Sequence, residues 1–404
     1  MGVTNRTEGY EEPACRLFVV VGGARRRVVA PAKVLGRGLL LAACALALGA
    51  ALPPRAWAQD ADRTGDGRSA GDAAEKGTAR KDAAARSMPR HPTLGWLPRV
   101  RLDNDAYNFW KHPGKRTDEE YTNGVVLGME TLRAPGWGRS LGRRAPGCAT
   151  ALTGDRACLS TLLFIGQDMY TPNLDRPPFS YAGWMYERPY AAWLYVGGEG
   201  RRISNRALRT YTVSLGVTGA PALGKLAQSI AHQISARYTT KATGWETQVG
   251  AEPGVLLGAR QSLLALRWAP GGSGILDLAP SVGTSLGNIR TSADAGARLR
   301  LGINMSHPWD PRAWRGRGVW EFQLSAAGRR EFVAHDFSLD GTLFRATDRQ
   351  VTRVPTVSEY EFGTALRLYR LHVGWRAVTR TREYSTGPAR HAYSQMYSSI
   401  EFRP

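Results

Sequence analysis

Two neighbouring stretches of the sequence concentrate side chains that could do chemistry. Leu102-Asp103-Asn104-Asp105 is followed, after a short polar loop, by Asp118-Glu119-Glu120-Tyr121-Thr122-Asn123-Gly124. Their carboxylate, amide, hydroxyl and backbone carbonyl oxygens are the hard ligands that Ca²⁺ prefers. An acidic turn that only caps a hairpin would have a similar composition. The spacing alone therefore leaves both a calcium site and a simple turn open.

The two stretches read as a strand, a loop and a returning strand. Alternation gives each strand two faces, because successive strand side chains point to opposite sides. In the first strand, one expected face has Arg101, Asp103 and Asp105 and the other has Val100, Leu102 and Asn104. In the returning strand, one face has Tyr121, Asn123, Val125, Leu127 and Met129 and the other has Thr122, Gly124, Val126, Gly128 and Glu130.

The rest of the chain, to about residue 402, alternates apolar and polar residues with the same period of two. The clearest runs are 209–217, 297–305, 319–326, 360–368 and 371–380, and a last strand is expected at about 391–402. An apolar face opposite one with Arg and Glu is typical of a membrane barrel, with lipid outside and a polar interior. A soluble sandwich also alternates, but its apolar face is buried. The residues expected to face lipid are Leu299, Leu301, Trp320, Phe322, Val373 and Trp375, and those expected to face inward are Arg298, Arg300, Glu321 and Arg376.

An export signal and the composition favour the barrel. A basic segment through Arg37 precedes an apolar run over 38–52 and the small-x-small site Ala56-Trp57-Ala58. This order predicts a signal region over 1–58 that is cleaved after Ala58. It leaves open a start codon downstream of Met1. The apolar run continues past Cys44, which argues against lipidation there. Residues 59–92 have almost no large apolar side chains and read as a disordered linker. We predict an all-β fold over 93–404: a 12-stranded antiparallel transmembrane β-barrel of the outer membrane.

The net charge of +20 implies an anionic partner. Nucleic acid would fit such a charge, but the export signal argues against it. The phosphates of an outer-membrane glycolipid are the expected partner, and we expect a monomer. Cys148 and Cys158, the two cysteines of the mature chain, bracket a turn-like segment and predict a disulfide in an oxidising compartment. No mature run of 18 apolar residues is present to form a transmembrane helix.

A short helix is expected in an outward-facing loop. If both chain ends are periplasmic, the loop after Asp105, the segment 167–176 and the segment 218–250 all lie at the outer end. Pro221 begins a helical pattern with an apolar stripe of Leu223, Leu226, Ala227, Ile230 and Ile234 and a polar side of Lys225, Gln228 and His232. His232 is then a candidate general base, with an ordinary surface histidine as the alternative. The other mature histidines have no such company in the sequence.

These pieces resemble the outer-membrane lipid A deacylase family, whose 3′-O-deacylase acts on surface lipopolysaccharide. The matching pieces occur in family order: Asn104-Asp105, Tyr121-Thr122-Asn123-Gly124, Gln167-Asp168-Met169-Tyr170-Thr171-Pro172, Arg188-Pro189-Tyr190-Ala191, Gly216-Val217-Thr218-Gly219 to Gln228 and His232, Gly244-Trp245 to Gln248, and Leu339-Asp340-Gly341. The resemblance implies a calcium-dependent ester hydrolase that removes the 3′-linked acyloxyacyl chain of lipid A. It implies that His232 activates water, that Asn104, Asp105 and Thr122 hold Ca²⁺ and the oxyanion, and that Asp105 is also catalytic.

Two positions depart from the family. The family has a lysine in the loop after Thr-Pro, where this chain has Arg176 and Pro177; Arg176 is the expected substrate-binding residue, through phosphate. The characterised member has a glutamate six residues after the histidine, where this chain has Tyr238. The nearest downstream acids are Glu246 and Glu252.

Two other functions compete with the hydrolase. One is a non-enzymatic barrel, either a small porin or a surface binding protein, which needs none of the four site residues. The other is an outer-membrane phospholipase with a Ser-His-Asn arrangement, for which no Ser and His have the required spacing.

Overall fold

The computed structural model describes residues 97–105, 120–131, 157–172, 187–234, 244–309, 320–344 and 350–400, with only the backbone of 232–234, and the backbone of two short strands, β1 (Val20–Val21) and β2 (Ala24–Arg25). The predicted signal region and linker otherwise lie outside these residues. The strands of the main sheet are β3 (Leu97–Asn104), β4 (Glu120–Thr131), β5 (Cys158–Thr171), β6 (Ala191–Ile203), β7 (Ala207–Thr218), β8 (Pro253–Leu263), β9 (Leu266–Trp268), β10 (Gly274–Gly287), β11 (Arg290–Met305), β12 (Trp320–Asp336), β13 (Thr356–Leu368), β14 (Leu371–Thr381) and β15 (Arg390–Ile400).

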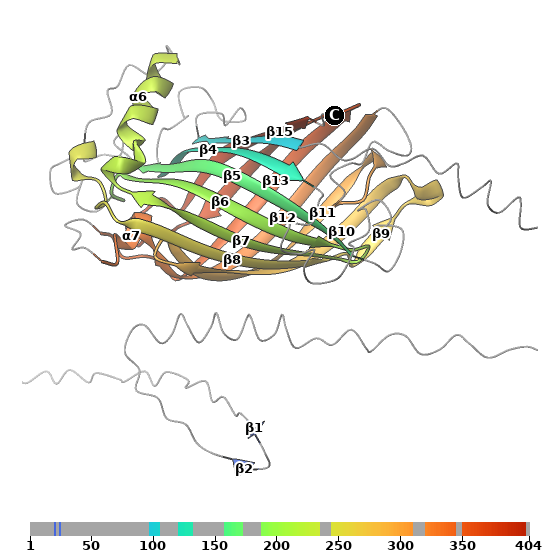
Figure 1. Ribbon diagram of the computed structural model, residues 1–404, viewed down its shortest axis with the longest axis horizontal. Helices are drawn as coiled ribbons and strands as arrows, with labels where there is room; N and C mark the ends of the chain where they lie inside the picture. Colours follow the sequence, from blue (N-terminus) through green and yellow to red (C-terminus); the bar gives the residue numbers. More distant parts are fainter. Residues whose placement is uncertain are drawn as a thin grey trace, which may run out of the picture.

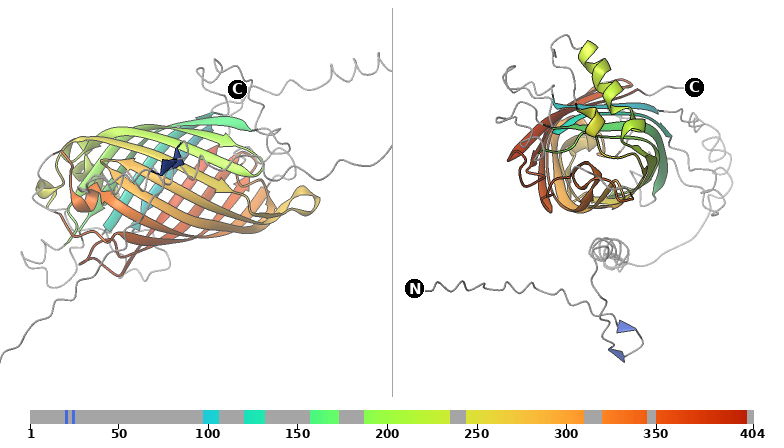
Figure 2. Two further views of the ribbon diagram at one scale, coloured as in Figure 1. Left: turned by 90° about the horizontal axis from the view of Figure 1, so that it is seen from below. Right: turned by 90° about the vertical axis from the view of Figure 1, so that its left-hand side faces the viewer.

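The main sheet closes on itself as an antiparallel barrel (Figures 1 and 2). Each strand pairs with its sequence neighbour, and β15 pairs with β3 to complete the ring. The sheet holds 13 described strands, but β8 and β9 pair with successive parts of β10 and occupy one position on the ring. The barrel is therefore 12-stranded, as the alternation predicted.

The two faces of the barrel wall carry the residues that the alternation assigned to them. Leu299 and Leu301 on β11 are 42% and 50% exposed, and Trp320, Phe322 and Val373 are also exposed. Arg298, Arg300, Glu321 and Arg376 line the interior cavity, whose volume is about 1020 Å³. Apolar side chains on the outside and charges on the inside match a wall that faces lipid.

Ion pairs fill much of the interior. Arg300 contacts Asp277 through two nitrogens at 2.9 and 2.5 Å, and Arg329 contacts Glu359 at 2.8 and 2.9 Å. Because an isolated charge in such a place is costly, bidentate pairing is what allows these groups to be enclosed.

Most of the long connections lie at one end of the barrel, the loop-rich rim. The opposite end holds both termini of the described barrel and the long connection over 132–157 between β4 and β5. The loop-rich rim contains the segments after β3, β5, β7, β12 and β14. Longer loops are typical of the extracellular side, which assigns the loop-rich rim to the outside. Its helices are η3 (Ala220–Ala222), α6 (Gly224–Ile234), η4 (Trp245–Thr247) and α7 (Phe337–Asp340), whereas η5 (Pro270–Gly272) lies near the other end. None of the helices in the described part of the chain has the length and apolar character needed to cross a membrane.

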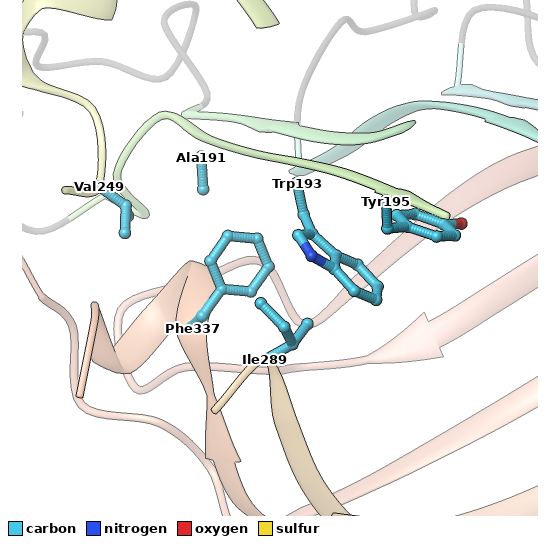
Figure 3. Close-up of a cluster of buried hydrophobic side chains, with 6 residues drawn as sticks. All are labelled: Ala191, Trp193, Tyr195, Val249, Ile289 and Phe337. Atoms are coloured by element: carbon cyan, nitrogen blue, oxygen red, sulfur yellow. The ribbon is translucent and has the colours of Figure 1, made fainter. Parts of the chain in front are cut away.

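An apolar cluster lies in the lumen near the loop-rich rim. Trp193 and Tyr195 of β6 stack with ring centroids 4.0 Å apart, and Ile289 and Phe337 pack against them from the segments after β10 and β12. Figure 3 shows these side chains pointing toward one another. Buried aromatic and aliphatic side chains therefore occupy part of the lumen at this level.

Cys158, the first residue of β5, is fully buried and disulfide-bonded. Its expected partner, Cys148, lies outside the described residues. We expect mature protein, unfolded without reductant, to show no free thiol, because Cys148 and Cys158 are the only cysteines left after cleavage. A thiol assay before and after reduction measures this, and two reactive thiols per unreduced chain would refute the pairing.

Candidate functional site

Polar side chains gather on the outer face of the wall where β3, β4 and β5 reach the loop-rich rim. Asp103, Tyr121 and Asp168 line the cavity, so the residues that alternate with them face outward. Asn104 pairs with Asn123 across β3 and β4. The outward set at this level comprises Asn104, Thr122, Asn123, Gln167, Met169 and Thr171. We refer to it as the wall patch.

A β-bulge gives Thr122 its place in the wall patch. Tyr121 pairs with Tyr170 and Asn123 with Met169, which leaves Thr122 as the extra residue of β4. Its hydroxyl oxygen lies 2.5 Å from that of Thr171. The strict alternation wrongly placed Tyr121 with the lipid-facing residues and Thr122 with the inward ones, because an inserted residue reverses the order of faces along a strand.

Inside the wall, the Tyr121 hydroxyl lies 2.8 Å from Asp103 and 3.0 Å from Asp168. A hydroxyl has one proton, so it donates to one carboxylate at a time. Arg101 lies 3.3 Å from Asp103 and balances the charge. These contacts join β3, β4 and β5 on their inner side and fix the strands that carry the wall patch outside.

The segments of η3 and η4 pack against the wall patch at β5. Gln167 donates its side-chain amide to the carbonyl of Ala222 at 2.5 Å. Beside this bond, Met169, Tyr190, Ala192, Ala222 and Trp245 form a buried apolar cluster against the outer face of the wall. Thr122 and Thr171 are each only 2% exposed although they face outward. Thr122, Met169 and Thr171 are therefore enclosed between the barrel wall and the rim segments, whereas Asn104, Asn123 and Gln167 are partly exposed.

Gln228 and Trp245 fix α6 against these rim segments. The indole nitrogen of Trp245 donates to the Gln228 side-chain oxygen at 2.7 Å, and Gln228 is 4% exposed. His232 is the residue one helical turn further along α6. A glutamine one turn from a histidine could be read in the sequence, but its burial could not, so the sequence did not identify Gln228 as part of the site.

The structure brings together some of the predicted site residues. Asn104 and Thr122 belong to the wall patch, and Asp105, the residue after β3, is 1% exposed. His232 lies on α6, which begins at the same rim, and the structure describes only its backbone. Arg176 and Tyr238 lie outside the described residues.

Neither acid downstream of Tyr238 takes a described part in the wall patch. Glu252 accepts the side-chain amide of Asn288 at 2.8 Å and the backbone amides of Leu343 and Phe344 at 3.3 and 3.0 Å. Its carboxylate therefore anchors the loop after α7. Glu246 is exposed on η4.

Two histidines have acidic neighbours that the sequence did not indicate. His335 Nδ1 lies 3.5 Å from Asp340, and His391 Nδ1 lies 3.6 Å from Glu383. Asp340 also contacts Arg353 at 2.9 Å, and Glu383 contacts Arg380 at 2.6 Å. Both carboxylates thus belong to structural ion pairs of the rim, and the expectation that only His232 has polar company was wrong.

Two members of the wall patch, Asn104 and Thr122, form with the next residue after Asn104, Asp105, a donor set that fits a hard cation. Among the residues whose side chains are described, no group of three or more His, Cys, Asp or Glu is arranged to hold a metal ion. Asn104, Asp105 and Thr122 instead offer an amide, a carboxylate and a hydroxyl oxygen. Oxygen donors of mixed type with a buried carboxylate suit Ca²⁺ rather than zinc or another ion that prefers nitrogen and sulfur.

A buried ionic cluster at the loop-rich rim holds the first residue of β4. Arg188 is fully buried and contacts Glu120 at 3.1 Å and Glu383 at 3.2 Å. The Tyr384 hydroxyl lies 2.8 Å from Glu120 and 2.9 Å from Glu187. This cluster ties β4, two residues before Thr122, to the loops before β6 and after β14.

The opposite charges in this cluster stabilise one another's charged forms. Burial would raise the pKa of Glu383, but the guanidinium groups of Arg380 and Arg188 outweigh burial and lower this pKa from 4.5 to about 2. Burial would lower the pKa of Arg188, but Glu120 and Glu383 raise it above its ordinary value. The Glu383 carboxylate thus stabilises the folded rim at neutral pH, and this contribution is lost only as the pH falls from 4.5 toward 2.

We expect Arg188→Met to destabilise the barrel by about 3–5 kcal/mol, because it leaves Glu120 and Glu383 buried without their shared cation. Urea unfolding of the barrel in lipid vesicles, followed by tryptophan fluorescence, measures the loss. Arg206→Met is the control, since Arg206 is exposed in the turn between β6 and β7 and should change the free energy of unfolding by less than about 0.5 kcal/mol. Equal effects of the two substitutions would contradict the cluster's role.

Comparison with known proteins places the chain among outer-membrane barrels. The family model of outer membrane protein LpxR matches residues 40–402. Among solved structures, LpxR from Salmonella typhimurium superposes with a TM-score of 0.59 at 21% identity, over 76% of this chain and 100% of that chain. That identity supports the barrel fold alone.

Two autotransporter barrels are more distant. The β domain of Bordetella BrkA has a TM-score of 0.38 at 11% identity, over 77% of this chain and 100% of that chain. The translocator domain of NalP from Neisseria meningitidis has a TM-score of 0.34 at 10% identity, over 80% of this chain and 94% of that chain. No curated protein sequence matches this chain. The family match spans most of the sequence, and the chain therefore belongs to the LpxR family of outer membrane proteins.

Proposed function

We propose that this protein is a Ca²⁺-dependent ester hydrolase that removes the 3′-linked acyloxyacyl chain from lipid A at the outer leaflet. The observation that carries the proposal is the position of the wall patch. Asn104, Thr122 and Thr171 lie on the lipid side of the wall and not in the lumen. A substrate held in a membrane by its acyl chains reaches the outer side of a barrel wall without passing through the barrel.

The proposed chemistry uses three oxygen donors and a base. Asn104, Asp105 and Thr122 would hold Ca²⁺. When bound, the ion would polarise the ester carbonyl and offset the charge that develops on its oxygen. His232 would take a proton from the attacking water, which needs no serine nucleophile.

The rim segments around the wall patch would position the base, bind the substrate phosphate and exclude water. Gln228 and Trp245 hold α6 in place at the rim, so a base on that helix is positioned by a buried hydrogen bond. Arg176 would bind a phosphate of the glycolipid, since a guanidinium matches phosphate oxygens with two parallel hydrogen bonds.

A non-enzymatic barrel remains the alternative, and the interior argues against its porin form. Trp193, Ile289 and Phe337 occupy part of the lumen near the loop-rich rim, and ion pairs occupy much of the rest. A surface binding protein would need neither the buried carboxylate of Asp105 nor the outward-facing bulge at Thr122.

Mass spectrometry of lipid A from cells with and without the protein tests the proposal. The protein should convert lipid A to a species lighter by one 3′ acyloxyacyl group. Cells that express the His232→Ala variant at the same level are the control and should keep the parent mass. An unchanged lipid A profile with well-expressed, membrane-inserted protein would overturn the deacylase proposal in favour of the binding protein.

A further inference from the structure

The apolar stripe of α6 points away from the protein. Leu223, directly before the helix, is 49% exposed, and Leu226 and Ile230 are 53% and 47% exposed. Gln228, on the other side of the helix, is 4% exposed and bonded to Trp245. A helix on a water-soluble protein normally buries its apolar side and exposes its polar side. Here the apolar stripe is exposed, as is Lys225, and the side with Gln228 is buried, so these large apolar side chains stand free of protein as do wall residues that face lipid.

The direction of α6 suits the plane of a membrane. In Figure 1 the helix extends from the loop-rich rim across the direction of the strands. Figure 2, viewed along the barrel, shows it outside the ring of strands and running away from it. Because the barrel axis crosses the membrane, a helix with this orientation runs along the membrane surface at the level of the rim.

The apolar stripe continues the lipid-facing surface of the barrel. Leu215 of β7 pairs with Val196 of β6 and with Val255 of β8, and these three side chains are 53%, 56% and 40% exposed. Leu215 lies three residues before the end of β7, which is roughly 10 Å of strand. The helix begins six residues after β7 ends. Amphipathic helices bury their apolar face about 5–10 Å into the boundary between headgroups and acyl chains, so the stripe lies within reach of that layer.

We propose that α6 is an interfacial helix whose Leu223, Leu226 and Ile230 insert among the acyl chains of the outer leaflet. The occupant of the stripe is lipid hydrocarbon, because the surface that it extends is already the lipid-facing surface of an outer-membrane barrel. The opposite side of the helix, with Gln228, stays against the rim. This inference rests on the place of the barrel in the membrane and not on the proposed hydrolase activity.

Site-specific fluorescent probes test the position of the helix. The variants Ile230→Cys and Leu226→Cys are labelled with an environment-sensitive dye, and Lys225→Cys, an exposed position on the polar side, is the matched control. Each protein is reconstituted into vesicles whose phospholipids carry bromine on the acyl chains, and unsubstituted protein treated with the dye gives the background. The probes at 226 and 230 should be quenched by brominated lipid at least about twofold more than the probe at 225, with the reverse order for aqueous iodide.

Two results would overturn the inference, and neither depends on activity. Equal quenching of all three probes by iodide would place the helix in water. Protection of the 226 and 230 probes from both quenchers would mean that protein, such as a second copy of the chain, covers the stripe. The test uses two probe positions so that it still gives a result if one variant fails to insert. Each probe is compared with the control at 225 in a folded barrel.

Discussion

Replacing His232 by alanine should lower the rate of lipid A ester hydrolysis by roughly 10²–10⁴-fold, the usual contribution of a general base. The wall patch supplies oxygen donors but no described group suited to accept a proton from water at neutral pH. The helix α6 at the same rim carries His232 one turn after Gln228, whose bond to Trp245 fixes the helix. Loss of the imidazole removes the base while leaving the buried contacts of α6 in place.

The measurement is turnover of purified protein on lipid A in detergent micelles, followed as release of the 3′ acyloxyacyl group. The control is His307→Ala, because His307 lies after β11 at the opposite end of the barrel and contacts the Asn205 carbonyl at 2.9 Å. A histidine base also predicts that the wild-type rate falls as the pH drops through the range in which imidazoles become protonated. Near-wild-type turnover by His232→Ala in a folded barrel would remove His232 from the mechanism.

The period-two pattern was enough to predict most of the fold. Each transmembrane strand must expose one face to lipid, so Leu299 and Leu301 outside and Arg298 and Arg300 inside follow directly from their order in the sequence. The same rule failed at Tyr121 and Thr122. A bulge adds one residue without any change in composition, so it reverses the faces while leaving the sequence pattern unmarked.

The pattern on α6 could be read in the sequence, but not its orientation. Hydrophobic periodicity shows that Leu223, Leu226 and Ile230 share a side, and it does not show whether that side meets protein or lipid. The buried position of Gln228 depends on Trp245, which comes from a segment 17 residues later. This contact between two segments is something that local sequence cannot indicate.

The rim contacts could not be predicted because their partners are far apart in the chain. Arg188 and Glu383 are separated by 195 positions, and Tyr384 and Glu120 by 264. Closure of the barrel brings β15 beside β3 and so brings these segments together. The sequence did identify Arg188 as part of a family piece, but its role in holding β4 next to Thr122 required the structure.

Replacing Asp105 by alanine should lower hydrolysis by about 10²-fold or more, because Asp105 supplies the one described carboxylate of the proposed Ca²⁺ site and an ion that polarises the carbonyl is worth several kcal/mol. The carboxylate is 1% exposed and follows Asn104, whose strand pairs with that of Thr122. Removal of a buried ligand weakens the hold on the ion more than it disturbs a barrel wall that is paired through the backbone.

Calcium titration separates a ligand role from a structural one. Chelation of wild-type protein with EGTA should reproduce the Asp105→Ala loss, and added Ca²⁺ should reverse the chelation. In the variant, half-maximal activity should require a higher Ca²⁺ concentration, and Ca²⁺ should raise the thermal midpoint of the wild type more than that of the variant, since an ion that binds only the folded state stabilises it. The control is Glu199→Gln, which removes an acid from the lumen side of β6 and should leave the Ca²⁺ response unchanged. If EGTA changes neither the activity nor the thermal midpoint, the wall patch holds no functional calcium, and the hydrolysis must depend on its amide and hydroxyl groups with His232 alone.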